Sequence, residues 1–209
     1  MKNDVVFVLL AGGKSQRMGV AKGLLKFEKS YWILEQLKRI SDSNIKTVLI
    51  GLGYNCTQYF DAIPWFKKAI ATHYEYLGLK IRVCVNLNPE FGKFSTLLTA
   101  VQSLNKKADI IINPIDVPIL NKLDINKIAS IKNTLVKPSF EGKTGHPIKI
   151  SAAYASYLKS IDFTKNIRLD LELKKIDTAN ISIIEVKDKD ILLNLNTKKE
   201  WLAYLNSIN

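Results

Sequence analysis

The stretch VVFVLLAGGKSQRMGVAKGLL, residues 5–25, decides the fold of this chain. It opens with an unbroken apolar run over residues 5–10. This run is rich in β-branched side chains and too short for a core helix, so it predicts a buried strand. The strand leads into Ala11-Gly12-Gly13, where the missing side chains let backbone N–H groups approach a ligand closely. Three cationic side chains then follow at short intervals: Lys14, Arg17 and Lys22. A strand, a glycine-rich turn and clustered positive charge together predict a polyphosphate-binding loop.

Two common nucleotide-binding motifs do not fit the chain. Residues 12–15, GGKS, resemble the end of a Walker A loop, but Val8 stands where that motif needs its first glycine. Gly51-Leu52-Gly53 also follows an apolar run, but Cys56 stands where a dinucleotide-binding fingerprint needs its third glycine. The spacing therefore argues against both a P-loop NTPase and a dinucleotide-binding protein.

The same stretch resembles the signature of the MobA-like nucleotidyltransferases, L-A-[AG]-G-x-S-x-R-M-G-x-x-K. The positions that match in register are Leu10, Ala11, Gly12, Gly13, Ser15, Arg17, Met18, Gly19 and Lys22. The competing interpretation is a strand followed by a flexible basic turn without a ligand, and the length of the match argues against it. The resemblance extends to the NLNT segment at residues 194–197 and so covers nearly the whole chain.

Length and composition indicate a single domain over residues 1–209. Hydrophobic residues make up 47% of the chain, an ordinary proportion, and no apolar run approaches the roughly 20 residues of a membrane span. The two cysteines are far apart and lack metal-ligand spacing, which favours a reducing cytoplasm. The net charge of +12 is spread along the chain without a basic–aromatic stripe. It therefore indicates anionic nucleotide ligands, and neither a specific nucleic-acid partner nor a membrane.

Strands and helices alternate along the chain, which predicts a three-layer α/β fold with a mostly parallel, doubly wound sheet. The resemblance implies the same Rossmann-like nucleotidyltransferase fold. Beyond the first strand, strands are expected at residues 46–50, 81–85, 108–113 and 181–186, with a hairpin-like insert at 135–148. Helices are expected after an N-cap at Ser30, over 61–77 with His73 on or beside the apolar face, and at 95–104, 152–158 and 164–174. Thr197 and Glu200 predict the capping box of a last helix.

Two further segments supply candidate site residues. Asp116 follows the strand expected at 108–113, and a carboxylate at the end of a central strand is well placed for a hard cation. The resemblance implies that Asp116 is the D-x-P aspartate that binds Mg²⁺. It also implies a second nucleotide-binding wall, where the family pattern is N-P…G-x-S-[ST]-[SL]-L and where Lys93 and Phe94 depart from that pattern. The residues that match this second pattern are Asn88, Pro89, Gly92, Ser95 and Leu97.

His146 stands in the sequence Gly-His-Pro-Ile at the start of an expected strand. The resemblance implies that this segment faces the second substrate, so His146 is a candidate acceptor-side residue. A histidine held between Gly145 and Pro147 for packing alone is an equal alternative.

The residues lack an evident protein nucleophile, because they include no Ser-His-Asp set, no paired glutamates and no cysteine in a basic setting. Phosphoryl and nucleotidyl transfer need little more than charge neutralisation and positioning. We expect an acceptor phosphate to attack the α-phosphorus of an NTP, with pyrophosphate as the leaving group. The expected catalytic residues are Arg17, Lys22 and Asp116, with Mg²⁺ on Asp116. The expected nucleotide-binding residues are Leu10, Ala11, Gly12, Gly13, Arg17, Lys22, Asn88, Ser95 and Asp116.

The resemblance implies a phosphorylated small-molecule acceptor, most often molybdopterin. The donor base is less clear, because LAGG and NLNT resemble the guanylyltransferases while the M-G-x-x-K spacing and the G-H-P segment resemble the cytidylyltransferases. GTP is narrowly favoured, since Gly12 lacks a methyl group and could leave room for a purine. Asn194 and Asn196 replace the carboxylates of a D-x-D-T motif, so one firmly held Mg²⁺ is expected. The alternatives are a sugar phosphate or other phosphorylated acceptor, a catalytically silent nucleotide-binding protein, and a basic nucleic-acid-binding protein.

Overall fold

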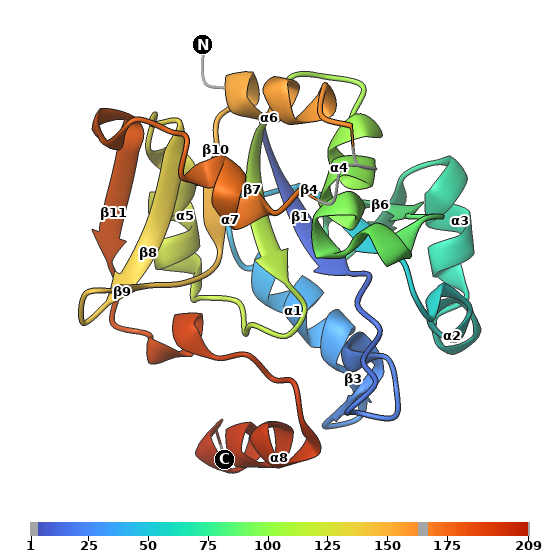
Figure 1. Ribbon diagram of the computed structural model, residues 1–209. Helices are drawn as coiled ribbons and strands as arrows, with labels where there is room; N and C mark the ends of the chain where they lie inside the picture. Colours follow the sequence, from blue (N-terminus) through green and yellow to red (C-terminus); the bar gives the residue numbers. More distant parts are fainter. Residues whose placement is uncertain (1–3, 163–166, 209) are drawn as a thin grey trace.

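The computed structural model describes residues 4–162 and 167–208, and within them a mixed β-sheet is flanked by helices on both faces (Figure 1). The strand order of the main sheet is β11-β8-β10-β7-β1-β4-β6-β5, with β9 paired to β8. Its strands are β1 Val5–Ala11, β4 Thr47–Leu52, β5 Tyr74–Tyr76, β6 Leu79–Val85, β7 Asp109–Pro114, β8 Leu135–Phe140, β9 Lys143–Thr144, β10 Ile148–Ile150 and β11 Ile181–Glu185. A small separate sheet pairs β2 Lys26–Phe27 with β3 Ser30–Tyr31.

The helices occupy the connections between these strands. They are α1 Trp32–Ser41, α2 Cys56–Ala62, α3 Trp65–Ala71, α4 Lys93–Gln102, α5 Lys122–Ser130, α6 Ala152–Lys159, α7 Leu169–Leu173 and α8 Lys198–Ile208. Short 3₁₀ turns are η1 Lys22–Leu24, η2 Pro89–Phe91, η3 Thr178–Asn180 and η4 Lys189–Leu192. The strands expected from the sequence are present, and the mostly parallel three-layer α/β architecture is confirmed.

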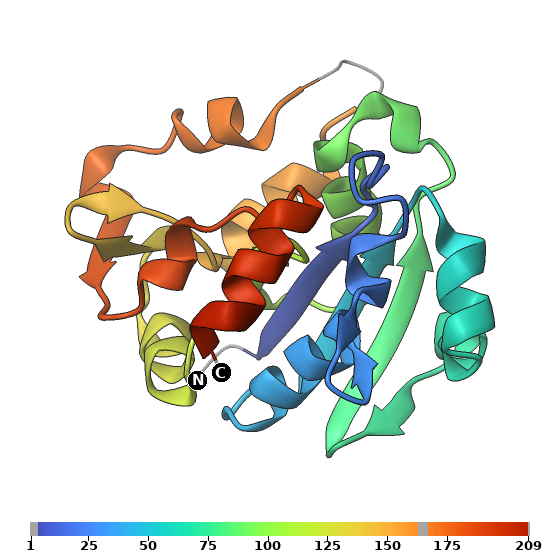
Figure 2. The same ribbon diagram turned by 90° about the horizontal axis from the view of Figure 1, so that it is seen from below.

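The first strand is the centre of the sheet. It pairs in parallel with β4 on one side and with β7 on the other. Because alternate side chains of a strand point to opposite faces, Phe7 and Leu9 enter one hydrophobic cluster while Val6 and Val8 enter another. The first cluster lies under α1, α5 and α8 and the second under α4 and α6. Figure 2 shows α8 on the same face of the sheet as α1, and the rings of Trp32 and Trp201 meet edge to face at 5.2 Å.

The long helix expected over residues 61–77 is wrong. Two short helices, α2 and α3, stand there and β5 follows. Ile63 ends α2 with non-helical backbone angles (φ −134°, ψ 77°), and Pro64, which has no N–H to continue the helical ladder, precedes α3. His73 is exposed, outside either helix, so its expected place on or beside an apolar helix face is wrong as well. The chain then reverses between β5 and β6 through Leu77 and Gly78, which both have positive φ.

Two helix starts were also different from those expected. Ser30 belongs to β3 and does not cap α1, whose N-cap is Tyr31 without a side-chain hydrogen bond. Residues 164–166 of the helix expected over 164–174 lie outside the described residues, and α7 accounts for the rest. The capping box of α8 is confirmed, because the Thr197 amide donates to Glu200 Oε2 at 2.8 Å and the Glu200 amide donates to Thr197 Oγ1 at 3.2 Å.

Candidate active site

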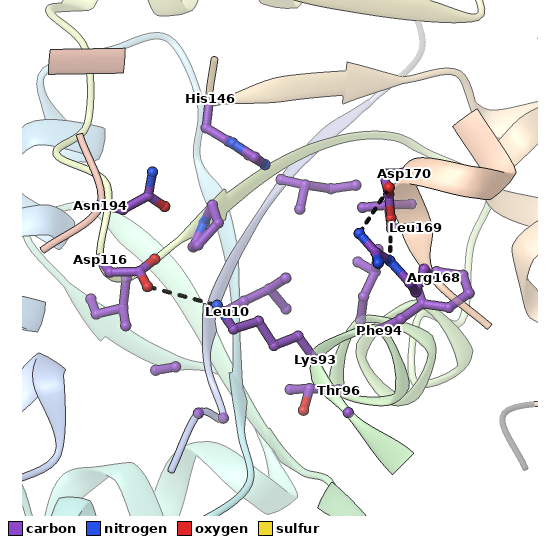
Figure 3. A pocket seen from close by; sticks show the side chains of 18 of the residues that line it. Leu10, Lys93, Phe94, Thr96, Asp116, His146, Arg168, Leu169, Asp170 and Asn194 are labelled. Atoms are coloured by element: carbon purple, nitrogen blue, oxygen red, sulfur yellow. Dashed lines mark hydrogen bonds and ion pairs between the residues drawn. The ribbon is translucent and has the colours of Figure 1, made fainter. Parts of the chain in front are cut away.

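A cavity of about 910 Å³ opens at the carboxyl ends of β1 and β7 (Figure 3). Its walls come from the loop after β1, the start of α4, the end of β7, the segment from β8 to β10, α7, and the chain before α8. Open α/β sheets bind their ligands at this edge, because the strand ends and the loops that follow them converge there. The cavity is therefore the candidate active site.

The glycine-rich loop follows β1 directly. A Cβ atom on Gly12 would lie 2.6 Å from Thr96 Oγ1, whereas a Cβ on Gly13 would meet nothing within 4 Å. Gly12 thus allows the loop to pack against α4, and Gly13 faces open space in the cavity wall. Met18 is buried and anchors the far end of the loop in the core, while Arg17 is exposed. Position 12 lacks a side chain because the side chain of Thr96 fills the space that a methyl group would need. Gly12 therefore gives no support to a purine base over a pyrimidine.

The two glycines make a matched pair of substitutions. We expect Gly12→Ala to lower the melting temperature by several degrees, because the new methyl overlaps the Thr96 side chain and overpacking costs about 1–3 kcal/mol. Gly13→Ala should melt close to the wild type and instead weaken nucleotide binding, since its methyl projects into the cavity. Thermal denaturation followed by circular dichroism measures the first effect and calorimetric titration the second. Equal melting temperatures for the two variants would contradict this assignment.

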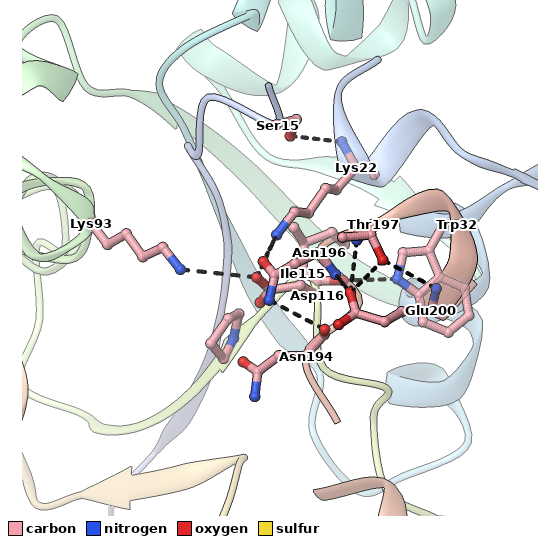
Figure 4. Close-up of polar contacts among 12 residues, drawn as sticks. Ser15, Lys22, Trp32, Lys93, Ile115, Asp116, Asn194, Asn196, Thr197 and Glu200 are labelled. Atoms are coloured by element: carbon pink, nitrogen blue, oxygen red, sulfur yellow. Dashed lines mark hydrogen bonds and ion pairs between the residues drawn. The ribbon is translucent and has the colours of Figure 1, made fainter. Parts of the chain in front are cut away.

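Asp116 forms the polar centre of the cavity (Figure 4). Its Oδ2 lies 2.7 Å from Lys22 Nζ, and the same ammonium donates to Asn196 Oδ1 at 2.5 Å. Lys93 Nζ approaches the same Oδ2 to 3.9 Å from the opposite side. The Asp116 side chain is only 6% exposed and that of Lys22 13%, so their ion pair is shielded from water and screened weakly by salt.

The backbone around Asp116 is fixed by its neighbours. The Leu195 amide donates to the Asp116 carbonyl at 2.8 Å, and Trp32 Nε1 donates to the Ile115 carbonyl at 2.8 Å. The Ile115 amide in turn donates to the Leu10 carbonyl at 2.9 Å, at the end of β1. The carboxylate is thereby held in register with the glycine-rich loop and with the segment before α8.

The residues around Asp116 fit a divalent cation that enters together with phosphates. Mg²⁺ is bound by oxygen, usually by one or two carboxylates together with substrate phosphates and water. Asp116, Asn194 and Asn196 supply such oxygen atoms here, and no group of three or more His, Cys, Asp or Glu side chains occurs among the described residues. Asp116 Oδ2 and Asn196 Oδ1 are both engaged by the Lys22 ammonium. The chain alone thus provides one carboxylate and amide oxygens, not a complete metal cage.

Of the residues expected to bind the nucleotide or the acceptor, Asn88 and Ser95 lie outside the cavity and the others line it. Those that line it are Leu10, Ala11, Gly12, Gly13, Lys14, Arg17, Lys22, Asp116 and His146. Asn88 is exposed outside it. Ser95 is buried behind it, where its hydroxyl donates to the Gly92 carbonyl at 2.7 Å and accepts from Asn86 Nδ2 at 2.7 Å. Ser95 thus ties the first turn of α4 to the residue that follows β6, while the N-cap of α4 is Gly92.

Several lining residues were not found from the sequence: Thr96, Lys137, Arg168 and Lys174. In the sequence, Lys93 stands out only as a departure from the family pattern of the second nucleotide-binding wall. In Figure 3 its side chain extends from the start of α4 toward Asp116. A departure in an otherwise matching motif was the one signal that could have identified it as a site residue.

His146 lies across the cavity from the glycine-rich loop, and its amide donates to the Ile191 carbonyl at 3.2 Å. Burial lowers the pKa of the imidazole to about 4, against the opposing effect of the Asp116 charge, and the charges of Lys137 and Lys93 lower it further. The ring is therefore neutral at pH 7 and can exchange hydrogen bonds with a ligand without adding positive charge.

The partly buried, neutral His146 predicts acid sensitivity. Between pH 6.5 and about 4 the unfolded chain binds a proton at His146 that the folded protein excludes, so stability falls as the pH falls through this window. The effect is at most about 3 kcal/mol for a shift of this size. We expect the melting temperature of His146→Gln to fall less than that of the wild type when the pH is lowered from 7 to 4.5. His73→Gln, at the exposed histidine, is the control and should keep the wild-type acid sensitivity. An unchanged pH dependence in His146→Gln would refute the effect.

A family model for the MobA-like NTP transferase domain matches residues 7–174 of the chain. The chain belongs to the MobA-like NTP transferase family. It is a nucleotidyltransferase by this membership, and the matched range includes the glycine-rich loop, Asp116 and His146. A search among curated proteins finds no match.

Solved structures of similar fold cover almost the entire transferase. Rv0371c from Mycobacterium tuberculosis H37Rv superposes with a TM-score of 0.75 at 17% identity, covering 99% of each chain, and it has also been solved as a manganese complex. The nucleotidyl transferase Mth528 from Methanothermobacter gives 0.74 at 18% identity, over 98% of this chain and 97% of that one. HddC from Yersinia pseudotuberculosis, complexed with GMP-PN, gives 0.70 at 12% identity, over 98% and 99%. At these identities the structures show a shared fold.

Among the described residues, no helix combines the length and apolar character that crossing a membrane requires.

Proposed function

We propose that the transferase moves an NMP group from an NTP to a phosphorylated small molecule and releases pyrophosphate. One observation carries this proposal: Asp116, Lys22 and Asn196, which are far apart in the sequence, meet in one cavity beside a glycine-rich loop. The loop has the features of a polyphosphate-binding site. Asp116, at the end of the neighbouring strand, lies close to the position that we propose for the reacting phosphate.

The chain's own residues perform positioning and charge neutralisation. Backbone N–H groups at Gly12 and Gly13, with Arg17 and Lys22, hold the β and γ phosphates and stabilise the charge that develops on pyrophosphate. Asp116 and Asn196 would hold a Mg²⁺ ion, which supplies charge neutralisation at the phosphates when it is bound.

The transfer is a direct displacement. An oxygen of the acceptor phosphate forms a bond to the α-phosphorus while the bond between that phosphorus and the bridging β-oxygen breaks, and pyrophosphate leaves with the electron pair. The product carries a new P–O–P link between acceptor and nucleotide. No protein nucleophile takes part, and no proton is transferred when the acceptor phosphate is a dianion.

GTP is proposed as the donor over CTP, and molybdopterin as the acceptor. The NLNT segment, which the sequence likened to guanylyltransferases, supplies Asn194 and Asn196 to the cavity wall, and a protein of similar fold was solved with GMP-PN. Because residues 194–197 follow the matched range and still contribute to the site, we propose that the whole chain works as one domain. The two free cysteines accord with the cytoplasm as its location.

A thermal-shift series tests the donor and the metal together. The protein is melted with GTP, CTP, ATP or UTP, each with and without Mg²⁺, and the series is repeated with Asp116→Asn. Binding at 100-fold above Kd stabilises a protein by about 2.7 kcal/mol, which raises the melting temperature by several degrees. We expect the largest magnesium-dependent rise with GTP and its loss in the variant. A larger rise in melting temperature with CTP would show that the donor is CTP and that GTP is the wrong assignment. No rise with any NTP would overturn the proposed nucleotidyl transfer.

A further inference from the structure

The cavity extends from the glycine-rich loop past Asp116 into a space lined by residues of β8, β10 and α7. Its total volume of about 910 Å³ is near the upper end of the roughly 300–1,000 Å³ found for small-molecule sites, which leaves room beyond a nucleotide. Figure 3 shows His146 on one side of this space and Leu169 with Arg168 on the other. We call it the acceptor half, bounded by Lys93, Lys137, His146, Ile148, Leu169 and Leu173.

The floor of the acceptor half is apolar. Phe94 and Leu97 from α4 line it, together with Ile112, Ile148 and Leu173, and all five belong to the hydrophobic cluster on that face of the sheet. Leu169 packs against the same cluster and also lines the cavity. A ligand body placed here would exchange water for aliphatic and aromatic carbon, which is favourable for an apolar group and unfavourable for unpaired hydroxyls.

The rim of the acceptor half is cationic. Lys93, Lys137 and Lys174 line it. Arg168 is already paired, because Nε and Nη2 donate to the two carboxylate oxygens of Asp170 at 2.9 and 3.1 Å. The Lys93 side chain is 82% exposed and its ammonium lies 3.9 Å from Asp116 Oδ2, so a phosphate that it bound would lie next to the reacting centre.

The described residues that line the cavity offer no unpaired carboxylate to accept from the hydroxyl groups of a sugar. The carboxylates among the described lining residues are Asp116 and Asp170, and each is already paired with a cation. Sites that select hydroxylated ligands supply side chains that pair with each hydroxyl, because an unpaired polar group costs free energy on burial.

We propose that the acceptor half selects a phosphate monoester whose body presents a flat apolar face, as a fused ring system does, over a polyhydroxylated sugar phosphate, and that Lys93 binds the phosphate of this acceptor beside Asp116. The inference rests on the proposed function, which places the nucleotide on the glycine-rich loop. It adds the chemical class of the second substrate and a residue that contacts it.

The test is calorimetric binding of three probes to the full chain: 1-naphthyl phosphate, glucose 1-phosphate and inorganic phosphate. We expect 1-naphthyl phosphate to bind at least about tenfold more tightly than the other two, a difference of about 1.4 kcal/mol. Equal or tighter binding of glucose 1-phosphate would overturn the proposal, and so would a failure of the naphthyl ester to bind.

Two pairs of variants separate the apolar floor from the cationic rim. Leu169→Ala should reduce the preference for the naphthyl ester, whereas Leu171→Ala, on the same helix but exposed and outside the cavity, should not. Lys93→Gln should weaken all three probes about tenfold, and Lys67→Gln, at an exposed lysine of α3, should weaken none. An unchanged preference in Leu169→Ala would contradict the role of the floor.

The result is distinguishable from a failure of the proposed function. If GTP gives its magnesium-dependent thermal shift but the naphthyl ester shows no preference, the acceptor assignment alone is wrong. If no nucleotide shifts the melting temperature, the proposed function is wrong whatever the probes do.

Discussion

Asp116→Asn is expected to lower kcat for nucleotidyl transfer by at least about 10³-fold, the largest effect of any single substitution in this chain. The carboxylate is the centre on which Lys22, Lys93 and the backbone of Leu195 converge, and it is the side chain in the best position to hold the metal at the phosphates. Removing one preorganised electrostatic group from an active site costs about 10²–10³ in kcat, and losing the metal as well adds to this.

The same substitution should leave the fold intact. Asparagine has the same shape as aspartate, and its amide oxygen can still accept the hydrogen bond that Lys22 donates. The loss of charge should therefore cost only about 1–3 kcal/mol of stability. Rate measurements and a melting curve on the same preparation separate the two effects. The control is Asp61→Asn, at an exposed carboxylate of α2, which should behave like the wild type. Activity within tenfold of the wild type in Asp116→Asn would contradict the assigned role.

Lys22→Met is the second substitution with a large expected effect. We expect kcat to fall by about 10²-fold or more, because the substitution removes the ammonium that we propose stabilises the leaving pyrophosphate. The protein should also lose stability, since Asp116 is left shielded from water without its closest counter-ion, and breaking a buried ion pair costs up to about 3–5 kcal/mol. The position of Lys22 after a glycine-rich loop predicts an exposed lysine whose loss has little effect on folding. This expectation is wrong, because the Lys22 side chain is only 13% exposed.

The variant makes a further, separable prediction about the metal. Removal of the ammonium frees Asp116 Oδ2 and Asn196 Oδ1, so Lys22→Met should bind Mn²⁺ alone more tightly than the wild type does. Titration followed by the electron paramagnetic resonance of free Mn²⁺ measures this without any enzyme activity. Lys29→Met, at an exposed lysine of the neighbouring turn, is the control. Weaker Mn²⁺ binding in Lys22→Met would show that Lys22 does not occupy the metal position.

The elements that the sequence predicted correctly carry local and redundant signals. Residues 5–10 form a continuous β-branched run, the glycines end it, and the capping box of Thr197 and Glu200 closes within four residues. Asp116 could be placed at a strand end for the same reason, because the apolar run before it is unambiguous. The loop and the carboxylate of the site were thus foreseeable before their distance was known.

The errors lie where local patterns compete with tertiary packing. The three- and four-residue spacing of Phe66, Ile70, His73 and Leu77 runs from α3 past the end of β5, so it mimics one helix. Trp65 stacks on Tyr74 and Tyr76, with ring centroids 4.6 and 5.3 Å away, and this packing stabilises the turn and the strand instead. Such contacts cannot be read from periodicity. Ser30 has a good N-cap side chain, but β3 pairs with β2 and uses it as a strand residue.

The features of the site that the sequence did not reveal are contacts between distant segments and the direction in which side chains point. Lys22 and Asn196 are 174 positions apart and hydrogen-bond to each other, and nothing in either neighbourhood indicates this. Lys93 reaches Asp116 only because α4 begins at the cavity. Ser95 carries a family pattern yet is buried behind Thr96, since a helix turn rotates adjacent residues to different sides.

The central claim is that the chain acts at the α-phosphorus of an NTP in the cavity around Asp116. The most direct test is the slow hydrolysis of GTP by the protein with Mg²⁺ and no acceptor, where water replaces the acceptor and the products are separated by ion-exchange chromatography. We expect GMP and pyrophosphate as the products, and neither product with Asp116→Asn. Formation of GDP and phosphate would show attack at the γ-phosphorus, and it would contradict the claim.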